Sequence, residues 1–141
     1  MSIDHRTIAE TMLSREGTGP AWGIEILEAG EGYSKLSMRL RPDMLNGHGM
    51  AHGGMIFALA DTAFAYACNS RNQASVGAQA SIAYLAPAHG GDVLVAEARE
   101  AAVAGRSGVY TVSVRTDDGR IVAEFQGLSR TIGGAVIGEG V

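Results

Sequence analysis

The chain contains few of the residues that mark specialised classes of protein. Its one cysteine, Cys68, among 141 residues excludes an intrachain disulfide and fits a reducing compartment. It has a single lysine, Lys35, and a total of Lys+Arg 11 against Asp+Glu 15 gives a formal charge of -4. Because a non-specific nucleic-acid binder needs a basic face, we expect no nucleic acid among its partners.

No hydrophobic run is long enough to cross a membrane. The longest apolar stretch, residues 55–68, is too short to span a bilayer and carries Asp61 in its middle. The first residues, MSIDHR, lack the apolar core of a signal peptide. With 46% hydrophobic and 18% charged residues, the composition is that of a globular protein. We therefore expect one cytoplasmic domain over residues 1–141, with no membrane partner.

Glycine, in contrast, is abundant, with 20 residues, which is about double the usual share. The glycines have no period; they mark turns and cluster at residues 47–54. Between the turns, the hydrophobic pattern predicts an N-terminal helix over 4–15 (within a segment 1–16), strands over 22–27 and 33–40, and a long apolar helix over 54–70. Four further strands are predicted near 76–86, 92–103, 108–116 and 120–131, with a hairpin turn at Asp117-Asp118-Gly119 and a loose tail at 133–141.

The order of these elements determines the expected fold. One helix, a hairpin, a long apolar helix and four strands do not alternate as in a doubly wound α/β protein. The economical arrangement is an α+β fold in which a six-stranded antiparallel sheet wraps around the long central helix. We expect that helix, which is rich in alanine and contains no proline, to be buried almost all round.

Asp61 is the most informative residue, because it is the only charged side chain between Gly53 and Ser70. Burial of an unpaired carboxylate is costly and disfavours its ionised form. Two interpretations are open at this point. The aspartate either has a structural role, capping a loop or binding a buried hydroxyl such as that of Thr62 in a neighbouring chain, or it is a general base or nucleophile held in an apolar pocket.

The segment before this helix offers a second candidate. In residues 46–54, NGHGMAHGG, glycines at a helix start leave backbone N–H groups open to a ligand, where the helix dipole favours developing negative charge. An oxyanion needs donors of this kind, although the glycines would also permit a tight loop and nothing more. His48 and His52 have the spacing of a metal pair, but no further Cys or His cluster supplies the remaining ligands. We expect no metal.

The spacing along the helix adds a geometric constraint. Gly53 and Asp61 are eight residues apart in the sequence, which is about 12 Å along one helix. A single carbonyl group cannot contact the Gly53 amide and the Asp61 carboxylate of the same helix. If both groups act on one bond, they come from different chains, and the site lies across a two-fold dimer interface.

Residues 46–70, NGHGMAHGGMIFALADTAFAYACNS, closely resemble the signature of the hotdog-fold thioesterases of the phenylacetate-degradation (PaaI) type. The resemblance extends over essentially the whole chain, through the hairpin, the signature loop, the long helix and the four strands. A lone HGG is weak evidence, but a spaced set of residues is fairly specific for this branch: Asn46, His52-Gly53-Gly54, Asp61 and Asn69-Ser70.

The resemblance implies an enzyme that hydrolyses an acyl-CoA thioester, with an aromatic, phenylacetyl-like acyl group and without a metal or other cofactor. By position, Asp61 would be the nucleophile or general base, and the Gly53 amide would polarise the thioester carbonyl. His52 and Asn46 would orient or hydrogen-bond near the thioester. A homodimer assembling into a homotetramer is also implied. The implied substrate-binding residues are Gly54, Thr62 and, from the facing subunit, Gln79, which stands where the family often has Ser or Thr.

Two other functions compete with this one, a non-catalytic hotdog module that binds acyl-CoA and a hotdog dehydratase. Retention of Asp61 in an apolar helix favours the hydrolase, because a pure binder has little reason to bear the desolvation cost. A CoA substrate should also meet cations near the pocket mouth, and arginine binds phosphate oxygens well. The candidates are Arg71, Arg99, Arg106 and Arg130.

Overall fold

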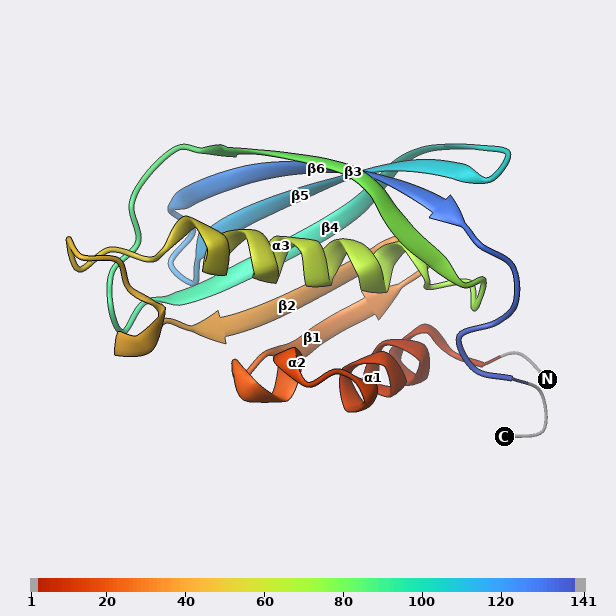
Figure 1. The fold of residues 1–141 in the computed structure, drawn as a ribbon, viewed down its shortest axis with the longest axis horizontal. Helices are drawn as coiled ribbons and strands as arrows, with labels where there is room; N and C mark the ends of the chain where they lie inside the picture. Colours follow the sequence, from red (N-terminus) through yellow and green to blue (C-terminus); the bar gives the residue numbers. More distant parts are fainter. Residues whose placement is uncertain (1–2, 139–141) are drawn as a thin grey trace.

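The computed structural model describes residues 3–138, in which a single sheet curves around one long helix (Figure 1). The helices are α1 (His5–Arg15), α2 (Thr18–Ala21) and α3 (Gly53–Cys68), with a short 3-10 helix, η1, at Pro42–Met44. The strands are β1 (Glu25–Gly30), β2 (Tyr33–Arg39), β3 (Ser75–Tyr84), β4 (Val93–Ala104), β5 (Ser107–Thr116) and β6 (Ile121–Thr131). No helix in the described range is both long and apolar enough to cross a membrane.

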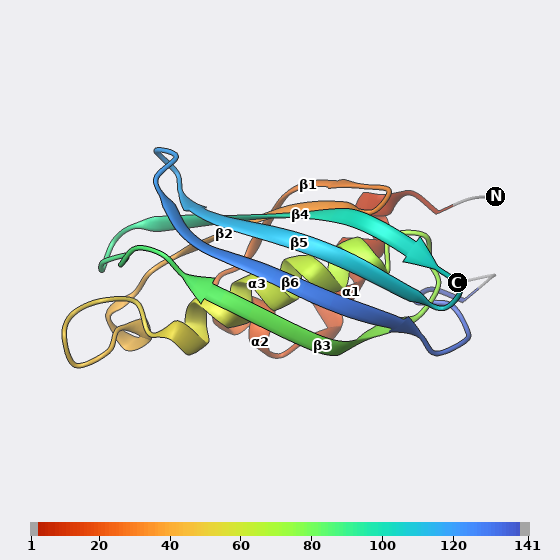
Figure 2. The ribbon, with the colours of Figure 1, turned by 90° about the horizontal axis from the view of Figure 1, so that it is seen from above.

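The strands pair antiparallel in the order β1-β2-β4-β5-β6-β3, and α3 crosses beneath their concave face (Figure 2). The predicted α+β class, with a six-stranded antiparallel sheet around a central helix, is therefore confirmed. The predicted hairpin turn at residues 117–119 joins β5 to β6, and its glycine has a positive φ of 93°. Glycine adopts this conformation without strain, which explains why the turn signal was reliable.

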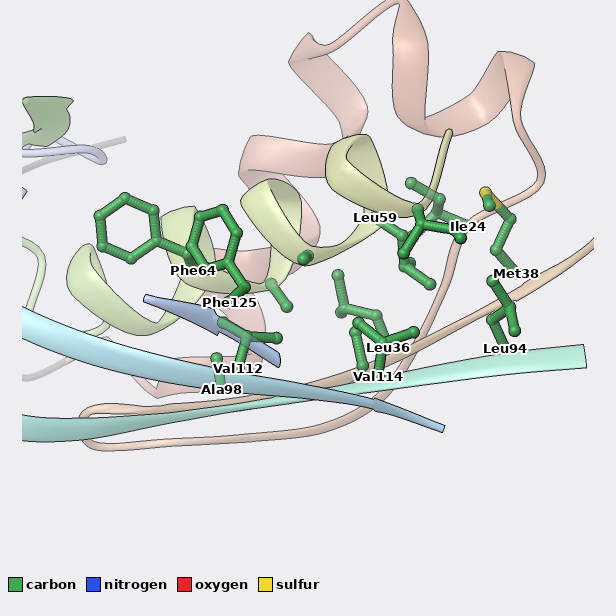
Figure 3. Packing of buried hydrophobic residues seen from close by; sticks show 14 of the residues in the cluster. Ile24, Leu36, Met38, Leu59, Phe64, Leu94, Ala98, Val112, Val114 and Phe125 are labelled. Carbon is green, nitrogen blue, oxygen red and sulfur yellow. The ribbon is translucent and has the colours of Figure 1, made fainter. Parts of the chain in front are cut away.

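The core lies between α3 and the concave face of the sheet. Leu59 on α3 is completely buried, and the ring of Phe64 packs against Phe125 of β6 with the ring centroids 5.7 Å apart. Figure 3 shows the rings of Phe64 and Phe125 side by side above Val112 of β5, and Leu59 further along α3 above Leu36. Phe64 fits because residue 127 is a glycine: a Cβ atom at Gly127 would lie 2.8 Å from the phenyl ring. This glycine lets β6 close tightly over the middle of α3.

The expectation that α3 is buried almost all round is wrong for one side of the helix. Gly54 and Asp61 are exposed, and Ala58, Thr62 and Ala65 are only half-buried. These five residues recur every three or four positions, so they lie on one side of α3, which we call the open stripe. The open stripe is uncovered because β3, which α3 contacts, is the last strand at that side of the sheet.

β3 is an unusual edge strand. Edge strands are normally protected by charged side chains or proline, yet β3 has the sequence SVGAQASIAY and is the only one of the described strands without a charged residue. Most of its residues are exposed, and Val76, Tyr84 and the following Leu85 each expose about half of their surface. Together with the open stripe, β3 forms an exposed surface whose one charged side chain is Asp61.

The first strand begins later than predicted. Residues 18–21 form a second short helix, α2, where no element was predicted. The chain is still helical at Ala21, so β1 begins at Glu25 rather than at Trp22 and continues to Gly30. The error arose because a glycine-proline segment marks a helix end and equally a new helix start, where proline is tolerated in the first turn.

The C-terminal segment is held in place where a loose tail was predicted. The Asn72 side chain exchanges two hydrogen bonds with the backbone of Ile137, of 2.9 and 2.8 Å, and Ile137 is buried. Arg15 of α1 also donates a 2.8 Å hydrogen bond to the carbonyl of Val136. Residues 133–138 are therefore fixed against the body of the protein, whereas residues 139–141 of the predicted tail lie outside the described range.

Candidate active site

The start of α3 presents one backbone donor that has no partner among residues 3–138. His52 is the N-cap residue; its Nδ1 accepts a 2.9 Å hydrogen bond from the Gly54 amide, and its carbonyl accepts from Met55 and Ile56. Among the described residues, nothing accepts a hydrogen bond from the Gly53 N–H. Because Nδ1 acts as the acceptor, the ring proton of neutral His52 lies on Nε2, on an exposed side chain. The cap thus leaves two donors without a partner in the described chain, the Gly53 N–H and the His52 Nε2–H.

Asn46 shapes the loop that leads into α3. Its Oδ1 accepts hydrogen bonds from the amides of His48 and Met50, at 2.9 and 3.2 Å, while its side-chain amide donates to no described residue. Asn46 and Gly53 line one cavity of about 300 Å³, which we call the loop cavity. The other residues that line it are mainly apolar: Met50, Ala51, Ile56, Tyr84, Leu85, Ala86 and Pro87.

The two histidines of this loop have different surroundings. His48 is exposed, and only its backbone takes part in the loop contacts described above. His52 is committed to the helix cap. Within residues 3–138, no group of three or more His, Cys, Asp or Glu side chains is placed to hold a metal ion.

Asp61 lies two turns further along α3, on the open stripe. It borders a second cavity of about 210 Å³, formed with Phe64 and residues 77–80 of β3, which we call the strand cavity. The carboxylate is exposed on one side, but desolvation by the surrounding chain raises the pKa of the Asp61 carboxyl above its usual value of 3.8.

No described residue donates a hydrogen bond to Asp61 or forms an ion pair with it. The structural role considered from the sequence, a bond to a hydroxyl such as that of Thr62 in a neighbouring chain, stays a prediction, and within its own chain Thr62 does not bond to Asp61. The Thr62 hydroxyl instead donates a 2.7 Å hydrogen bond to the Ala58 carbonyl in its own helix. Within the described chain, Asp61 is therefore a partly desolvated carboxylate without a hydrogen-bond or ion-pair partner, which makes it a candidate functional group.

The structure brings some of the predicted site residues together and separates others. Asn46, His52 and Gly53 gather at the N-terminal end of α3, in and beside the loop cavity. Asp61 lies in the strand cavity, which shares no lining residue with the loop cavity. This separation agrees with the distance of about 12 Å along one helix, so a single chain does not place Gly53 and Asp61 on one bond.

The three implied substrate-binding residues have different surroundings. The Gly54 amide is occupied by His52, so it is not a free donor. The Thr62 side chain lies on the open stripe near Asp61. Gln79 borders the strand cavity, but it is paired with Leu128 of β6 after a register shift between Gly77 and Gln79. That pairing puts its side chain on the convex face of the sheet, beside an outer groove formed with Ser81, Val109 and Gln126.

Two residues of the recognised motif, Asn69 and Ser70, have structural roles. Both are buried just after α3. The Asn69 side chain accepts from the amide of Ser75 at 2.8 Å and donates to its carbonyl at 3.0 Å, which fixes the start of β3. The Ser70 hydroxyl accepts from the Gly32 amide at 2.8 Å in the turn between β1 and β2. These bonds set where β3 and Asp61 lie relative to each other.

The arginines proposed for phosphate binding divide into two pairs. Arg71 forms ion pairs with Glu31 and Glu100, at 3.0 and 2.7 Å. Arg99 pairs with Glu97 at 3.1 Å, and its guanidinium carbon lies 4.9 Å from the centre of the Tyr33 ring.

The guanidinium groups of Arg106 and Arg130, in contrast, have no hydrogen-bond or ion-pair partner in the described part of the chain. Arg106 lines a small polar cavity of about 50 Å³ together with Gln73, Ser107 and Thr131. Arg130 is exposed and is paired with Ser107 across the sheet. Of the four candidate arginines, only Arg106 and Arg130 are therefore unpaired within the described chain and available to bind an anion.

A curved six-stranded antiparallel sheet around one long helix is the fold of a known class of protein. The model of the thioesterase superfamily matches residues 48–123, and the chain belongs to this family. The prediction of a thioester hydrolase with a hotdog fold is confirmed at the level of the family and the fold.

Individual relatives place the chain within this family. It is 40% identical to the acyl-coenzyme A thioesterase PaaI of Escherichia coli strain K12, over 93% of this chain and 94% of that protein. The structure of the E. coli PaaI protein from the phenylacetic acid degradation operon superposes with a TM-score of 0.91 at 39% identity, covering 93% and 95% of the two chains. The resemblance to the PaaI type is thereby confirmed.

A more distant structure bears on the ligand. The smu.793 protein of Streptococcus mutans UA159, bound to acetyl CoA, matches with a TM-score of 0.76 at 26% identity, over 79% of this chain and 90% of that chain.

Proposed function

We propose that this protein hydrolyses an acyl-CoA thioester to a free acid and CoA. The observation that carries the proposal is the pair of unused groups on α3, the Gly53 N–H and the Asp61 carboxylate, each bordering its own cavity. The similarity to an acyl-coenzyme A thioesterase and to a structure bound to acetyl CoA supports the substrate class.

The complete site forms between two chains that pair through β3. Two copies of β3 related by a two-fold axis pair antiparallel, which satisfies the open edge and covers the open stripe. In this arrangement the Tyr84 end of one strand lies beside the Val76 end of the other. The loop cavity adjoins Tyr84 and the strand cavity adjoins Gly77. Pairing through β3 therefore brings Gly53 of each chain toward the partner's Asp61, and two such dimers form the proposed homotetramer.

The chemistry follows from these two groups. The Gly53 N–H donates to the thioester oxygen and stabilises the negative charge that develops on it. If Asp61 is the general base, it takes a proton from water, the resulting hydroxide adds to the carbonyl carbon, and the C–S bond breaks as the CoA sulfur takes up that proton. If Asp61 is the nucleophile, its carboxylate displaces CoA and water then hydrolyses the mixed anhydride. After one turnover in isotopically labelled water, labelled oxygen in Asp61 would demonstrate the second route, with water attacking the aspartyl carbonyl of the anhydride, because the first route never places oxygen from water in Asp61.

Two polar groups near Gly53 can also bind the thioester. His52 presents Nε2–H and Asn46 presents its side-chain amide, and neither group has a partner in the described chain. Both can donate hydrogen bonds to a thioester held against Gly53. The apolar walls of the loop cavity, such as Ile56 and Leu85, favour an aromatic acyl group over a polar one.

The proposed activity is tested by following thiol release from phenylacetyl-CoA, benzoyl-CoA and a short aliphatic acyl-CoA. We expect thiol release at a rate proportional to the enzyme concentration. The value of kcat/KM should be highest for an aromatic acyl-CoA. A blank without substrate corrects for Cys68, which is buried and reacts slowly with a thiol reagent. Binding of these compounds without any thiol release would instead identify a non-catalytic acyl-CoA-binding module.

Neutralising the two unpaired arginines is expected to weaken binding of the CoA phosphates. Arg106→Gln and Arg130→Gln should each raise KM for an acyl-CoA about three- to tenfold and leave kcat nearly unchanged, because the phosphates are remote from the scissile bond. The effect should diminish at high salt. Arg115→Gln, at the opposite end of β5, removes the same charge and serves as the control. An unchanged KM in both test variants would show that these side chains do not contact CoA.

A further inference from the structure

Tyr84 makes a contact with Gly53 that the sequence pattern does not indicate. Tyr84 is the last residue of β3, and its pairing with the buried Ala123 puts its side chain on the face of the sheet that α3 occupies. Its hydroxyl donates a 2.8 Å hydrogen bond to the Gly53 carbonyl. Its ring also covers the Cα of Gly53, since a Cβ atom there would lie 3.1 Å from Cζ and Oη of the tyrosine.

This contact completes a clamp on one peptide group. The carbonyl of Gly53 and the amide of Gly54 belong to the same peptide unit. Tyr84 donates to that carbonyl, and His52 Nδ1 accepts from that amide at 2.9 Å. Two consecutive glycines at a helix start would otherwise be the most mobile part of α3, because glycine has the greatest backbone freedom. The clamp holds the backbone immediately after the unpaired Gly53 N–H.

The contact also explains why residue 53 is a glycine. Gly53 is helical and does not have a positive φ, so no backbone strain requires glycine there. What favours glycine is the ring of Tyr84, which would have to shift by a few tenths of an ångström to admit a Cβ atom. A tyrosine that is 51% exposed stabilises the fold only modestly through one hydrogen bond to a backbone carbonyl. Its closeness to Gly53 therefore has its main consequence at the loop cavity, which both residues line.

We propose that Tyr84 is a positioning residue for the reaction: through the Gly53 carbonyl and the covered Cα, it holds the Gly53 N–H at the place where the thioester oxygen binds. This inference rests on the proposed thioester hydrolysis. A preorganised donor contributes to the rate because it need not reorient as charge develops. Loss of the clamp therefore lowers the rate of the chemical step more than it weakens substrate binding.

The test compares Tyr84→Phe, which keeps the ring and removes only the hydroxyl, with wild type and with Tyr33→Phe. Tyr33 is a matched control, because its hydroxyl also donates hydrogen bonds, to Glu28 and Glu97, but on the convex face of the sheet. We expect Tyr84→Phe to lower kcat about tenfold with KM changed by less than about twofold. Tyr33→Phe should keep the kcat of wild type. A rise in KM at constant kcat would make Tyr84 a substrate contact and overturn the inference.

Hydrogen–deuterium exchange of the peptides that cover residues 52–56 supplies a measurement independent of activity. Tyr84→Phe should accelerate exchange there at least about threefold, while exchange in β4 and β5 stays as in wild type. Unchanged exchange at the start of α3 would overturn the inference whatever the activity. Wild-type protein that releases no thiol would contradict the proposed function alone, and faster exchange in Tyr84→Phe would still support the clamp.

Discussion

Substitution of Asp61 by asparagine is expected to lower kcat for thioester hydrolysis by at least about a hundredfold while the protein remains folded. Asparagine has nearly the size of aspartate but can neither accept a proton nor attack a carbonyl carbon. Because Asp61 makes no hydrogen bond or ion pair within the described chain, the substitution breaks no structural contact. Steady-state kinetics together with size-exclusion chromatography measure both halves of this prediction.

The same substitution has an expected effect on stability with a definite pH dependence. Desolvation raises the pKa of the Asp61 carboxyl above 3.8, so the unfolded chain loses this proton at a lower pH than the folded protein does. The ionised carboxylate therefore destabilises the fold above its usual pKa, and this penalty disappears at lower pH, where both states are protonated. We expect Tm of Asp61→Asn to equal or exceed that of wild type near neutrality, and the difference to shrink on acidification.

Asp117→Asn is the matched control, because Asp117 is exposed in the turn between β5 and β6. It should keep wild-type kcat and show no such trend in Tm. In wild type, kcat should fall on acidification with an apparent pKa above 3.8, because only the ionised Asp61 acts as base or nucleophile. Near-wild-type turnover by folded Asp61→Asn would remove this residue from the mechanism.

Mixing two inactive variants is expected to restore activity, because each proposed site takes Gly53 from one chain and Asp61 from the other. The first variant is Asp61→Asn and the second is Gly53→Pro, which removes the N–H donor. Each homodimer lacks one component at both sites. In a mixed dimer one site lacks both components and the other is whole. Co-refolding in equal amounts makes half of the dimers mixed, so we expect up to about one quarter of wild-type activity per chain.

The backbone at residue 53 suits this experiment. Gly53 is the first residue of α3, where proline is tolerated, and His52 before it has an extended conformation with ψ 132°, which proline also accepts. The remaining conflict is with the ring of Tyr84, which is half exposed and has room to move. Gly53→Ala separates the two effects, because it meets the same ring but keeps the N–H.

Size-exclusion chromatography of each variant confirms first that it is folded and dimeric. The mixture is then assayed before and after co-refolding, and only the second sample should be active. Absence of any regained activity from folded, exchanging chains would place both groups in one chain's site. That result would contradict the separation of about 12 Å along α3.

The sequence pattern predicted the elements well where local periodicity is strong. The limits of α3 and of the last four strands agree within about two residues, and the predicted strand over 33–40 is β2, in which buried residues such as Leu36 and Met38 alternate with more exposed ones. The errors fall where one signal has two meanings. A glycine-proline segment marked both a helix end and the start of α2, and glycines near the C-terminus suggested a loose tail that Asn72 in fact anchors.

Three features around the candidate site were not predicted, because each depends on contacts between residues that are distant in the chain. A register shift beside Ala78 turns Gln79 toward the convex face, and such an irregularity has no signature in one sequence. Arg71 appeared free because Glu31 and Glu100, which bind it, are about thirty or more residues away in the chain. The contact of Tyr84 with Gly53 was not predicted, because a single tyrosine at the end of a strand forms no recognisable sequence pattern.

The sequence by itself determined which groups are available for chemistry. It also determined that Gly53 and Asp61 are too far apart on one helix to contact the same carbonyl group, because the distance along a helix depends only on the number of residues between them. Only the tertiary structure decided which of these groups are unused. The N-cap of His52 occupies the Gly54 amide and leaves that of Gly53, and the end of the sheet at β3 leaves Asp61 on an uncovered side of α3. Hydrogen-bond partners and burial depend on residues distant in the chain, which local spacing cannot specify.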